Sequence, residues 1–172
     1  MRDSVVNPLF KLLGWDVSNE KGTKPEFREV MVEKKSNKRV PDYTFTLNGV
    51  KKFFVEAKKP AVNIQVDFDP VFQARSYGWS ARHSIVVLTN FEYLLIYDAT
   101  VKPESEDNVK TALLKKYHYT DYIENWDEIK TYLSRDIVYS GEFDRRYEEL
   151  LKNRDKILVD EDFLNQINKW RI

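Results

Sequence analysis

Apolar residues in the first hundred positions gather in five short stretches, several of which alternate with polar residues. Such stretches predict β-strands that bury one face, or both faces where the stretch is apolar throughout. Residues 84–89, SIVVLT, predict a central strand, and residues 93–99, YLLIYDA, predict its hairpin partner. The expected strands cover residues 27–34, 42–47, 51–58, 84–89 and 93–99.

Apolar residues at helical spacing predict a first helix over residues 3–13, with Gly14 as its stop and Pro8 as a kink or a break. A second helix over residues 70–81 would cross the sheet. Beyond residue 100 the pattern becomes helical and charged. The helices expected there cover about residues 106–115, 125–134, 142–155 and 160–170.

The helix that crosses the sheet has a clear expected start, because Asp69 can cap it and Pro70 suits the first helical position. Its small residues Ala74 and Gly78, four positions apart, would let it pack closely against a sheet. The expected fold class is therefore α/β. A mixed sheet of about five strands would be flanked by helices and followed by a helical C-terminal part.

Asn48 and Gly49 separate two of the expected strands, and a two-residue turn is the default for this pair. That turn would place Asp42 opposite Val55, so Glu56 would point to the other face. A three-residue loop shifts the pairing by one and brings Asp42 opposite Glu56, with the large apolar side chains together on the other face. We therefore expect a three-residue loop, or a bulge with the same effect. The expected pairs are Leu47 with Lys51, Phe45 with Phe53, and Tyr43 with Val55.

The charged residues Asp42, Glu56 and Lys58 lie in or beside these apolar strands, where charge is costly unless it is paired. Two neighbouring carboxylates repel each other unless one takes up a proton or a divalent cation binds between them. Mg²⁺ prefers such oxygen ligands, and the backbone carbonyl of Ala57 could supply another. A lysine beside the metal can orient or deprotonate a water and neutralise developing charge. The pattern predicts a site that hydrolyses phosphodiesters.

Composition narrows the class of protein. The chain has 172 residues, which suits one domain, and 42% of them are hydrophobic and 33% charged. It has no cysteine and two histidines, which argues against a zinc site. The net charge of zero argues against a surface that is basic throughout, but not against a local basic cleft. No apolar run approaches a membrane span and no secretory signal opens the chain, so we expect a cytoplasmic protein.

Proline and aspartate at positions 41–42, followed by EAK at positions 56–58, resemble the signature of PD-(D/E)xK nucleases. QARSY, with Gln73 and Tyr77 four positions apart, is similar to the QxxxY motif of the RecB-like branch. From about residue 5 to residue 100 the chain resembles the N-terminal nuclease domain of type I restriction subunits and of type IIG restriction-modification enzymes. FLNQINKWRI at the end of the chain resembles the start of the helical connector that leads to a methyltransferase.

The resemblance implies a restriction-endonuclease-like core in residues 1–100, with residues 101–172 as a helical extension of the same domain or a connector. It implies a Mg²⁺-dependent endodeoxyribonuclease that acts on double-stranded DNA and accepts Mn²⁺ as a substitute. Methyltransferase, specificity or motor domains of the same restriction system would be its partners. The implied roles are metal binding by Asp42, Glu56 and Ala57, action on water by Lys58, and positioning of Lys58 or contact with DNA by Gln73 and Tyr77.

Several alternatives stay open at the level of the sequence. Lys59, Arg75 and Arg82 are candidate phosphate contacts, although any surface helix carries such residues. An acidic residue that relatives often carry on the first helix could here only be Asp3. A nuclease fold kept for DNA binding or for subunit assembly, without catalysis, is the main rival. RNA, or branched or single-stranded DNA, as the substrate is another.

Overall fold

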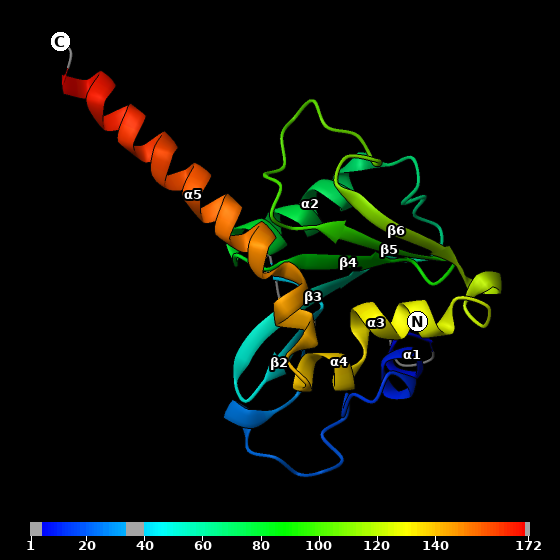
Figure 1. The fold of residues 1–172 in the computed structure, drawn as a ribbon. Helices are drawn as coiled ribbons and strands as arrows, with labels where there is room; N and C mark the ends of the chain where they lie inside the picture. The colour runs from blue at the N-terminus through cyan, green and yellow to red at the C-terminus, as the bar shows by residue number, and fades with distance from the viewer. Residues whose placement is uncertain (1–4, 34–39, 171–172) are drawn as a thin grey trace.

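The computed structural model describes residues 5–33 and 40–170, and a mixed six-stranded sheet lies at its centre (Figure 1). The strands follow one another in the order β1-β2-β3-β4-β5-β6. β3 and β4 are parallel, and every other neighbouring pair is antiparallel. The strands are β1 (Val30–Val32), β2 (Tyr43–Leu47), β3 (Val50–Ala57), β4 (Ile85–Thr89), β5 (Tyr93–Asp98) and β6 (Leu113–His118). The expected α/β class with a mixed sheet is confirmed.

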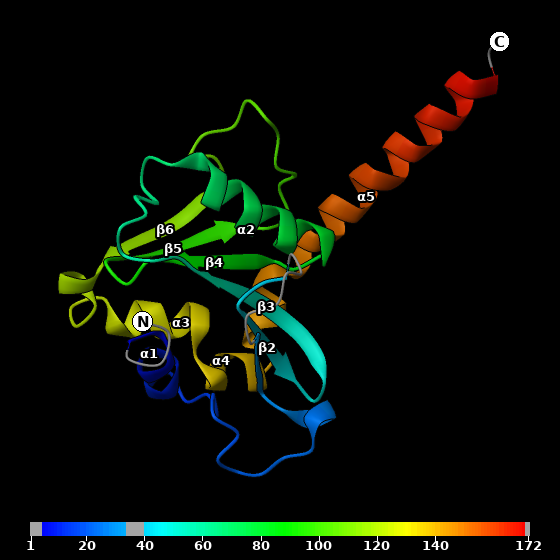
Figure 2. The same ribbon diagram turned by 180° about the vertical axis from the view of Figure 1, so that it is seen from behind.

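Helices cover both faces of this sheet, as Figures 1 and 2 show from opposite sides. One helix, α2, lies alone on one face, while α1, α3 and α4 lie on the other. The last helix, α5, begins beside this second layer and then projects away from the body. The helices are α1 (Asn7–Leu12), α2 (Phe68–Ser80), α3 (Trp126–Leu133), α4 (Arg135–Tyr139) and α5 (Glu142–Trp170), with short 3₁₀ turns η2 (Pro25–Phe27) and η3 (Tyr119–Asp121).

Two hydrophobic clusters match the two faces. The larger one contains every second residue of the central strands, such as Phe53 and Val55, and is covered by α1, α3 and the start of α5. The smaller one contains the alternate residues, such as Phe54, and is covered by α2. Since side chains alternate along a strand, Glu56 shares the α2 face with Phe54.

The hairpin between β2 and β3 reaches the expected pairing by a bulge rather than by a longer loop. Asn48 and Gly49 both have positive φ and form a two-residue turn, with Leu47 opposite Val50, so the three-residue loop and the pair of Leu47 with Lys51 were wrong. Lys52 is the extra residue of the bulge, because Thr46 pairs with Lys51 and Phe45 with Phe53. From there on the register is the expected one, with Tyr43 opposite Val55.

The ring pair of Phe45 and Phe53 explains why the bulge forms. Both rings are fully buried and stack with centroids 4.6 Å apart and an interplanar angle of 5°. A regular ladder from the Asn48–Gly49 turn would separate these rings onto opposite faces. Burying both rings on one face outweighs the local disruption of the ladder.

α2 starts earlier than expected. Its N-cap is Asp67, whose side chain accepts a hydrogen bond from the Asp69 amide, so Asp69 and Pro70 lie inside the first turn. The close approach to the sheet is confirmed at Gly78, where an added Cβ would lie 2.8 Å from the Cβ of Ala99. A larger residue there would push α2 away from the sheet.

Other differences lie at the two ends of the chain. The first helix is shorter than expected, with Pro8 in its first turn, and Gly14 ends it at φ +93° as expected. The expected strand over residues 27–34 is reduced to β1 and preceded by η2. The helix expected over residues 106–115 was wrong, because residues 113–118 form β6 at the edge of the sheet.

The C-terminal helices also differ in their boundaries. The helix expected over residues 125–134 is confirmed as α3, whereas α4 was not expected. The two helices expected after residue 142 are the single helix α5, since the segment between them contains no glycine or proline. Arg154 is the last buried residue of α5 in the described chain. None of the described helices is long and apolar enough to cross a membrane.

Candidate active site

The predicted charged residues meet where the parallel strands β3 and β4 end, on the face that α2 covers. Ala57 pairs with Thr89 in the last step of the parallel ladder, and the Lys58 amide donates a 2.8 Å hydrogen bond to the Thr89 carbonyl. The chain therefore leaves the sheet at Lys58 with its backbone still held by β4. Residues at the carboxyl ends of such strands can present side chains beyond the sheet edge.

Asp42 lies directly before β2 and is only 8% exposed. One of its oxygens, Oδ2, accepts a 2.8 Å hydrogen bond from the Ala57 amide. The last pair of the ladder is Tyr43 with Val55, so Asp42 and Glu56 are the next residues of the two chains. Because Asp42 bonds the amide of Ala57, which follows Glu56, the structure brings Asp42 to the end of β3 as the sequence predicted.

A chain of hydrogen bonds connects β3 with α2. The Lys58 ammonium donates to Oε1 of Glu56 at 2.8 Å and to Oε1 of Gln73 at 2.7 Å. The Gln73 amide nitrogen then donates to the Tyr77 hydroxyl at 2.9 Å. Gln73 and Tyr77 lie on one side of α2 because they are four positions apart. Four of the predicted residues are therefore linked by consecutive hydrogen bonds, and these bonds fix the position of the Lys58 ammonium.

Glu56 is the most deeply buried charge of this group, with 5% of its surface exposed. Lys58 contacts its Oε1, while its buried Oε2 has no hydrogen-bond partner among the residues that the structure describes. A buried carboxylate oxygen without a donor is costly. Its chemistry suits a cation, so this oxygen fits the expected metal.

The ligands expected at this edge are two carboxylates and the Ala57 carbonyl. Within residues 5–33 and 40–170, no group of three or more His, Cys, Asp or Glu side chains is arranged to hold a metal. Mg²⁺ is commonly held by one or two carboxylates together with waters and phosphate oxygens. Asp42, Glu56 and Ala57 therefore fit Mg²⁺ better than a metal that needs a full set of protein ligands.

An open cavity of about 600 Å³ adjoins this chain of hydrogen bonds. Gln73 and Tyr77 form part of its lining, so the polar end of the site faces an accessible space. The lining residues are Asp69, Phe72, Gln73, Ser76 and Tyr77.

The three candidate phosphate contacts lie in different environments. Lys59 and Arg82 are exposed, Lys59 next to the site and Arg82 after the far end of α2. Arg75 is fully buried, and its guanidinium bonds Asp107 at 2.7 Å and faces the carbonyls of Val101 and Lys102. The structure does not bring Arg75 to the site, because its charge is already engaged in holding the loop after β5.

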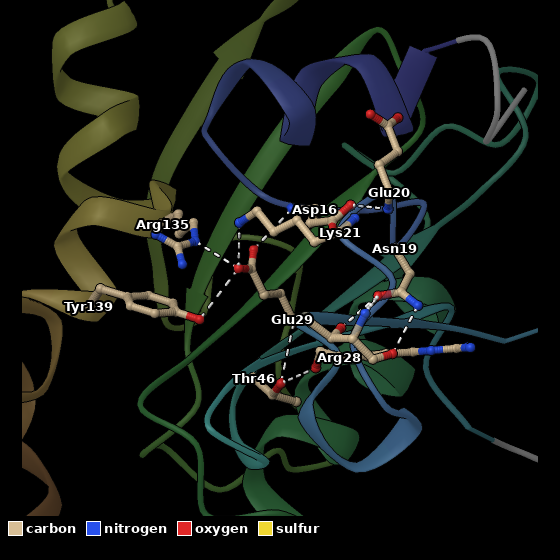
Figure 3. Close-up of polar contacts among 10 residues, drawn as sticks. Asp16, Asn19, Glu20, Lys21, Arg28, Glu29, Thr46, Arg135 and Tyr139 are labelled. Atoms are coloured by element: carbon tan, nitrogen blue, oxygen red, sulfur yellow. Dashed lines mark hydrogen bonds and ion pairs between the residues drawn. The ribbon is translucent and has the colours of Figure 1, made fainter.

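Glu29 forms a separate polar cluster, which Figure 3 shows. Its Oε1 accepts from Arg135 at 2.9 Å and from Lys21 at 3.0 Å, and its Oε2 accepts from the Asp16 amide at 3.0 Å. Burial would raise the pKa of the Glu29 carboxyl, but these hydrogen bonds outweigh burial and hold the pKa below its ordinary value. The cluster ties the loop after α1 to α4 and takes no part in the site.

One predicted feature, the acidic residue Asp3, falls outside the described residues. Thr89, whose carbonyl holds Lys58, was not expected at the site. The sequence contains no local sign of this contact, because parallel neighbours lie far apart along the chain.

Comparison with known proteins agrees with this description. Residues 27–105 match the model of the family described as "Type I restriction enzyme R protein N terminus". Asp42, Glu56, Lys58, Gln73 and Tyr77 all lie within this matched segment.

The whole chain is similar to "Type II restriction enzyme and methyltransferase RM.Eco57I" from Escherichia coli, with 40% identity over 178 residues. The alignment covers 100% of this chain and 18% of that protein, so the chain spans about a fifth of its relative. No solved structure matches the chain. The predicted resemblance to type I restriction subunits and to fused restriction-methyltransferases is thus confirmed.

Proposed function

We propose that this chain is a Mg²⁺-dependent endodeoxyribonuclease domain of the PD-(D/E)xK type in a restriction-modification system. The observation that carries the proposal is the position of Lys58, whose ammonium is held between Glu56 and Gln73, while the neighbouring Ala57 amide bonds the carboxylate of Asp42. A structural ion pair would need only one partner for the lysine. Here a second helix contributes an amide and a hydroxyl that fix where the charge points.

In this proposal Asp42, Glu56 and the Ala57 carbonyl hold Mg²⁺. When bound, the metal would make its water more acidic and stabilise charge on the attacked phosphate. Lys58 would orient the attacking water and place its positive charge beside the negative charge that develops on the phosphate. Gln73 and Tyr77 would act as positioning residues, because they touch Lys58 or each other and keep the ammonium in one place.

Double-stranded DNA is the proposed substrate, and the cytoplasm is the proposed location. The chain carries no net charge, so we expect it to bind DNA weakly on its own and to rely on other parts of the system for sequence recognition. The Escherichia coli relative is named as both a restriction enzyme and a methyltransferase. By analogy, methyltransferase, specificity or motor domains of the same system are the proposed partners.

Cleavage of supercoiled plasmid at low salt, with Mg²⁺, with Mn²⁺ or with EDTA, tests the proposal. We expect metal-dependent nicking that Lys58→Met reduces at least about 100-fold, since such a group contributes about 10²–10⁴-fold. Lys102→Ala, which removes an ammonium whose side chain is 64% exposed, is the matched control and should cleave like the wild type. Circular dichroism would check that each variant is folded.

Calorimetric titration with Mn²⁺ separates the two main outcomes if no cleavage is seen. Binding by the wild type that Asp42→Asn abolishes would support a competent site that needs other domains for activity. A folded wild-type protein that binds no metal and cuts no DNA would refute the proposal and favour a module for DNA binding or subunit assembly.

A further inference from the structure

Four aromatic rings follow one another across the turn between β4 and β5 and the end of β6. The rings of Phe91 and Tyr119 stack with centroids 5.7 Å apart and an interplanar angle of 16°. Tyr119 contacts His118 at 4.5 Å, and His118 contacts Tyr93 at 5.0 Å. Lys116 places its ammonium 5.1 Å from the centre of the Tyr93 ring. We call Phe91, Tyr93, His118 and Tyr119 the ring row.

The ring row lies at the same end of the sheet as the candidate active site. Thr89 connects the two, because its carbonyl accepts from the Lys58 amide and its Oγ1 accepts from the Phe91 amide. In Figures 1 and 2, η3 and the turn between β4 and β5 lie together at this end. The Tyr119 amide bonds the Glu92 carbonyl at 2.9 Å, which fixes η3 against that turn.

An apolar groove of about 440 Å³ runs beside the ring row. Phe91 and Tyr119 form part of its wall and remain 38% and 49% exposed. Thr89 also lines the groove, so the groove reaches the end of the sheet where the chain leaves β3 at Lys58, on the face that α1 covers. Its lining residues are Val5, Val6, Pro8, Leu9, Leu12, Thr89, Phe91, Tyr119 and Tyr122.

The backbone at Phe91 is strained. Its φ is +80°, a region that bulky residues rarely adopt because their Cβ clashes with the backbone. Glycine or asparagine would fit this turn at lower cost. Phe91 keeps this backbone conformation although its ring is 38% exposed, which indicates that the ring serves a purpose in addition to packing on Tyr119.

We infer that the ring row binds unpaired DNA bases next to the phosphodiester to be cleaved, an inference that rests on the proposed nuclease function. Aromatic faces stack on bases of any sequence. In a duplex both faces of each base are already stacked, so only a base in a single-stranded, frayed or branched segment can pack against the exposed rings. The nuclease would therefore prefer DNA whose strands are separated beside the cut.

The charges around the ring row suit this partner in part. Lys116 is exposed and can approach the phosphate of a stacked nucleotide. Glu92 lies 3.6 Å from His118 and repels phosphate, so we expect the backbone of the strand to follow the Lys116 side. Stacking then supplies most of the affinity, and charge contributes little.

Binding of a 12-nucleotide single strand with one central 2-aminopurine tests the inference. The full 172-residue chain would be titrated into it in EDTA, so that no cleavage occurs. We expect saturable quenching of the 2-aminopurine fluorescence by the wild type, and weaker quenching with a duplex of the same sequence. Tyr119→Ala should raise the Kd about tenfold and remove the quenching, whereas Tyr119→Phe should keep both.

Two further variants control for folding and for general loss of apolar surface. Phe91→Gly removes a ring but relieves the positive φ, so it should stay folded and yet bind more weakly. Ile123→Ala removes a side chain that is 90% exposed and makes no ring contact, so it should bind like the wild type. Because stacking is not ionic, Tyr119→Ala should lower the affinity without changing its dependence on salt.

Unchanged binding and quenching in Tyr119→Ala and Phe91→Gly would overturn the inference, as would a wild type that never quenches the probe. A self-association of the wild type that Tyr119→Ala disrupts, seen by sedimentation, would instead assign the groove to a second protein chain. Lys58→Met should quench like the wild type. A wild-type protein that quenches the probe but does not cleave DNA would thus contradict only the proposed hydrolysis. A wild-type protein that cleaves DNA but does not quench the probe would contradict only the proposed role of the ring row.

Discussion

The carboxylate of Asp42 accepts a 2.8 Å hydrogen bond from the backbone amide of Ala57, across the two strands that carry the candidate site. This bond holds the start of β2 against the end of β3. It also turns one carboxylate oxygen of Asp42 toward the backbone, while the buried Oε2 of Glu56 has no hydrogen-bond partner among the described residues. Burying that oxygen of Glu56 is costly for folding, and its chemistry suits a cation.

Two substitutions of Asp42 distinguish its role in folding from its role in metal binding. Asp42→Asn keeps an oxygen that can accept from Ala57 and removes a negative charge, so we expect loss of Mn²⁺ binding and cleavage with a smaller loss of stability than in Asp42→Ala. Asp42→Ala leaves the Ala57 amide without this acceptor and should cost about 1–3 kcal/mol. Urea unfolding and calorimetry would measure the two effects. Equal losses of stability in the two variants would contradict this account.

The Tyr77 hydroxyl fixes the orientation of the Gln73 amide, and through it the Lys58 ammonium. Tyr77→Phe should lower the cleavage rate by about tenfold, because a less well-oriented group contributes less to the transition state. The KM for DNA should change little. Tyr139→Phe removes a hydroxyl that lies 3.5 Å from Glu29, outside the site, and is the matched control. An increase in KM at a constant kcat would mean that Tyr77 contacts DNA instead.

The contact at Gly78 sets the distance between α2 and the sheet. An alanine there would bring its Cβ to 2.8 Å from Ala99 and 3.1 Å from Val86, so α2 must shift. Gly78→Ala should destabilise the fold by about 1–3 kcal/mol and also reduce cleavage, because Gln73 moves with the helix. Ser80→Ala, on the exposed end of α2, should change neither. Thermal unfolding and plasmid nicking would measure both effects, and a stabilised Gly78→Ala variant would exclude the close contact.

His83 makes stability depend on pH. It is 5% exposed, and burial lowers its pKa from 6.5 to about 4, assisted by the nearby charges of Lys51 and Arg154. The unfolded chain therefore takes up this proton first as the pH falls. The stability that neutral His83 contributes is fully present above pH 6.5 and is lost as the pH falls toward 4. At pH 5 the loss amounts to about 2 kcal/mol.

The comparison with His83→Gln isolates this effect from the titration of carboxylates. Chemical unfolding of both proteins between pH 7.5 and pH 4.5 should give a difference in stability that shrinks as the pH falls. A constant difference across this range would show that His83 does not titrate on unfolding.

The site could be predicted from the sequence to the extent that it depends on local spacing. Asp42, Glu56 and Lys58 follow from the alternation of a single hairpin, and Gln73 and Tyr77 follow from one turn of a helix. The sequence could not show whether a bulge at Lys52 or a longer loop sets the register. Both produce the same pairing of Phe45 with Phe53 and of Tyr43 with Val55.

The strand β6 and the buried ion pair of Arg75 were not predicted, because both depend on partners that are distant in the sequence. β6 has an irregular pattern in which Tyr117 alone is buried, and it is a strand because it pairs with β5. Arg75 resembles an ordinary surface cation on α2, while the residue that neutralises it, Asp107, lies 32 positions further on. The residues next to β6 and to Arg75 in the sequence therefore give no sign of β5 or Asp107 as partners.

The bulge at Lys52 has an effect beyond the hairpin. The ring of His83, three residues beyond the end of α2, packs edge-on against the ring of Phe54, with centroids 4.3 Å apart. Phe54 follows the bulge by two residues and lies on the α2 face in the register that the bulge sets. The register that aligns Asp42 with Glu56 therefore also sets a contact with the segment that follows the helix of Gln73 and Tyr77.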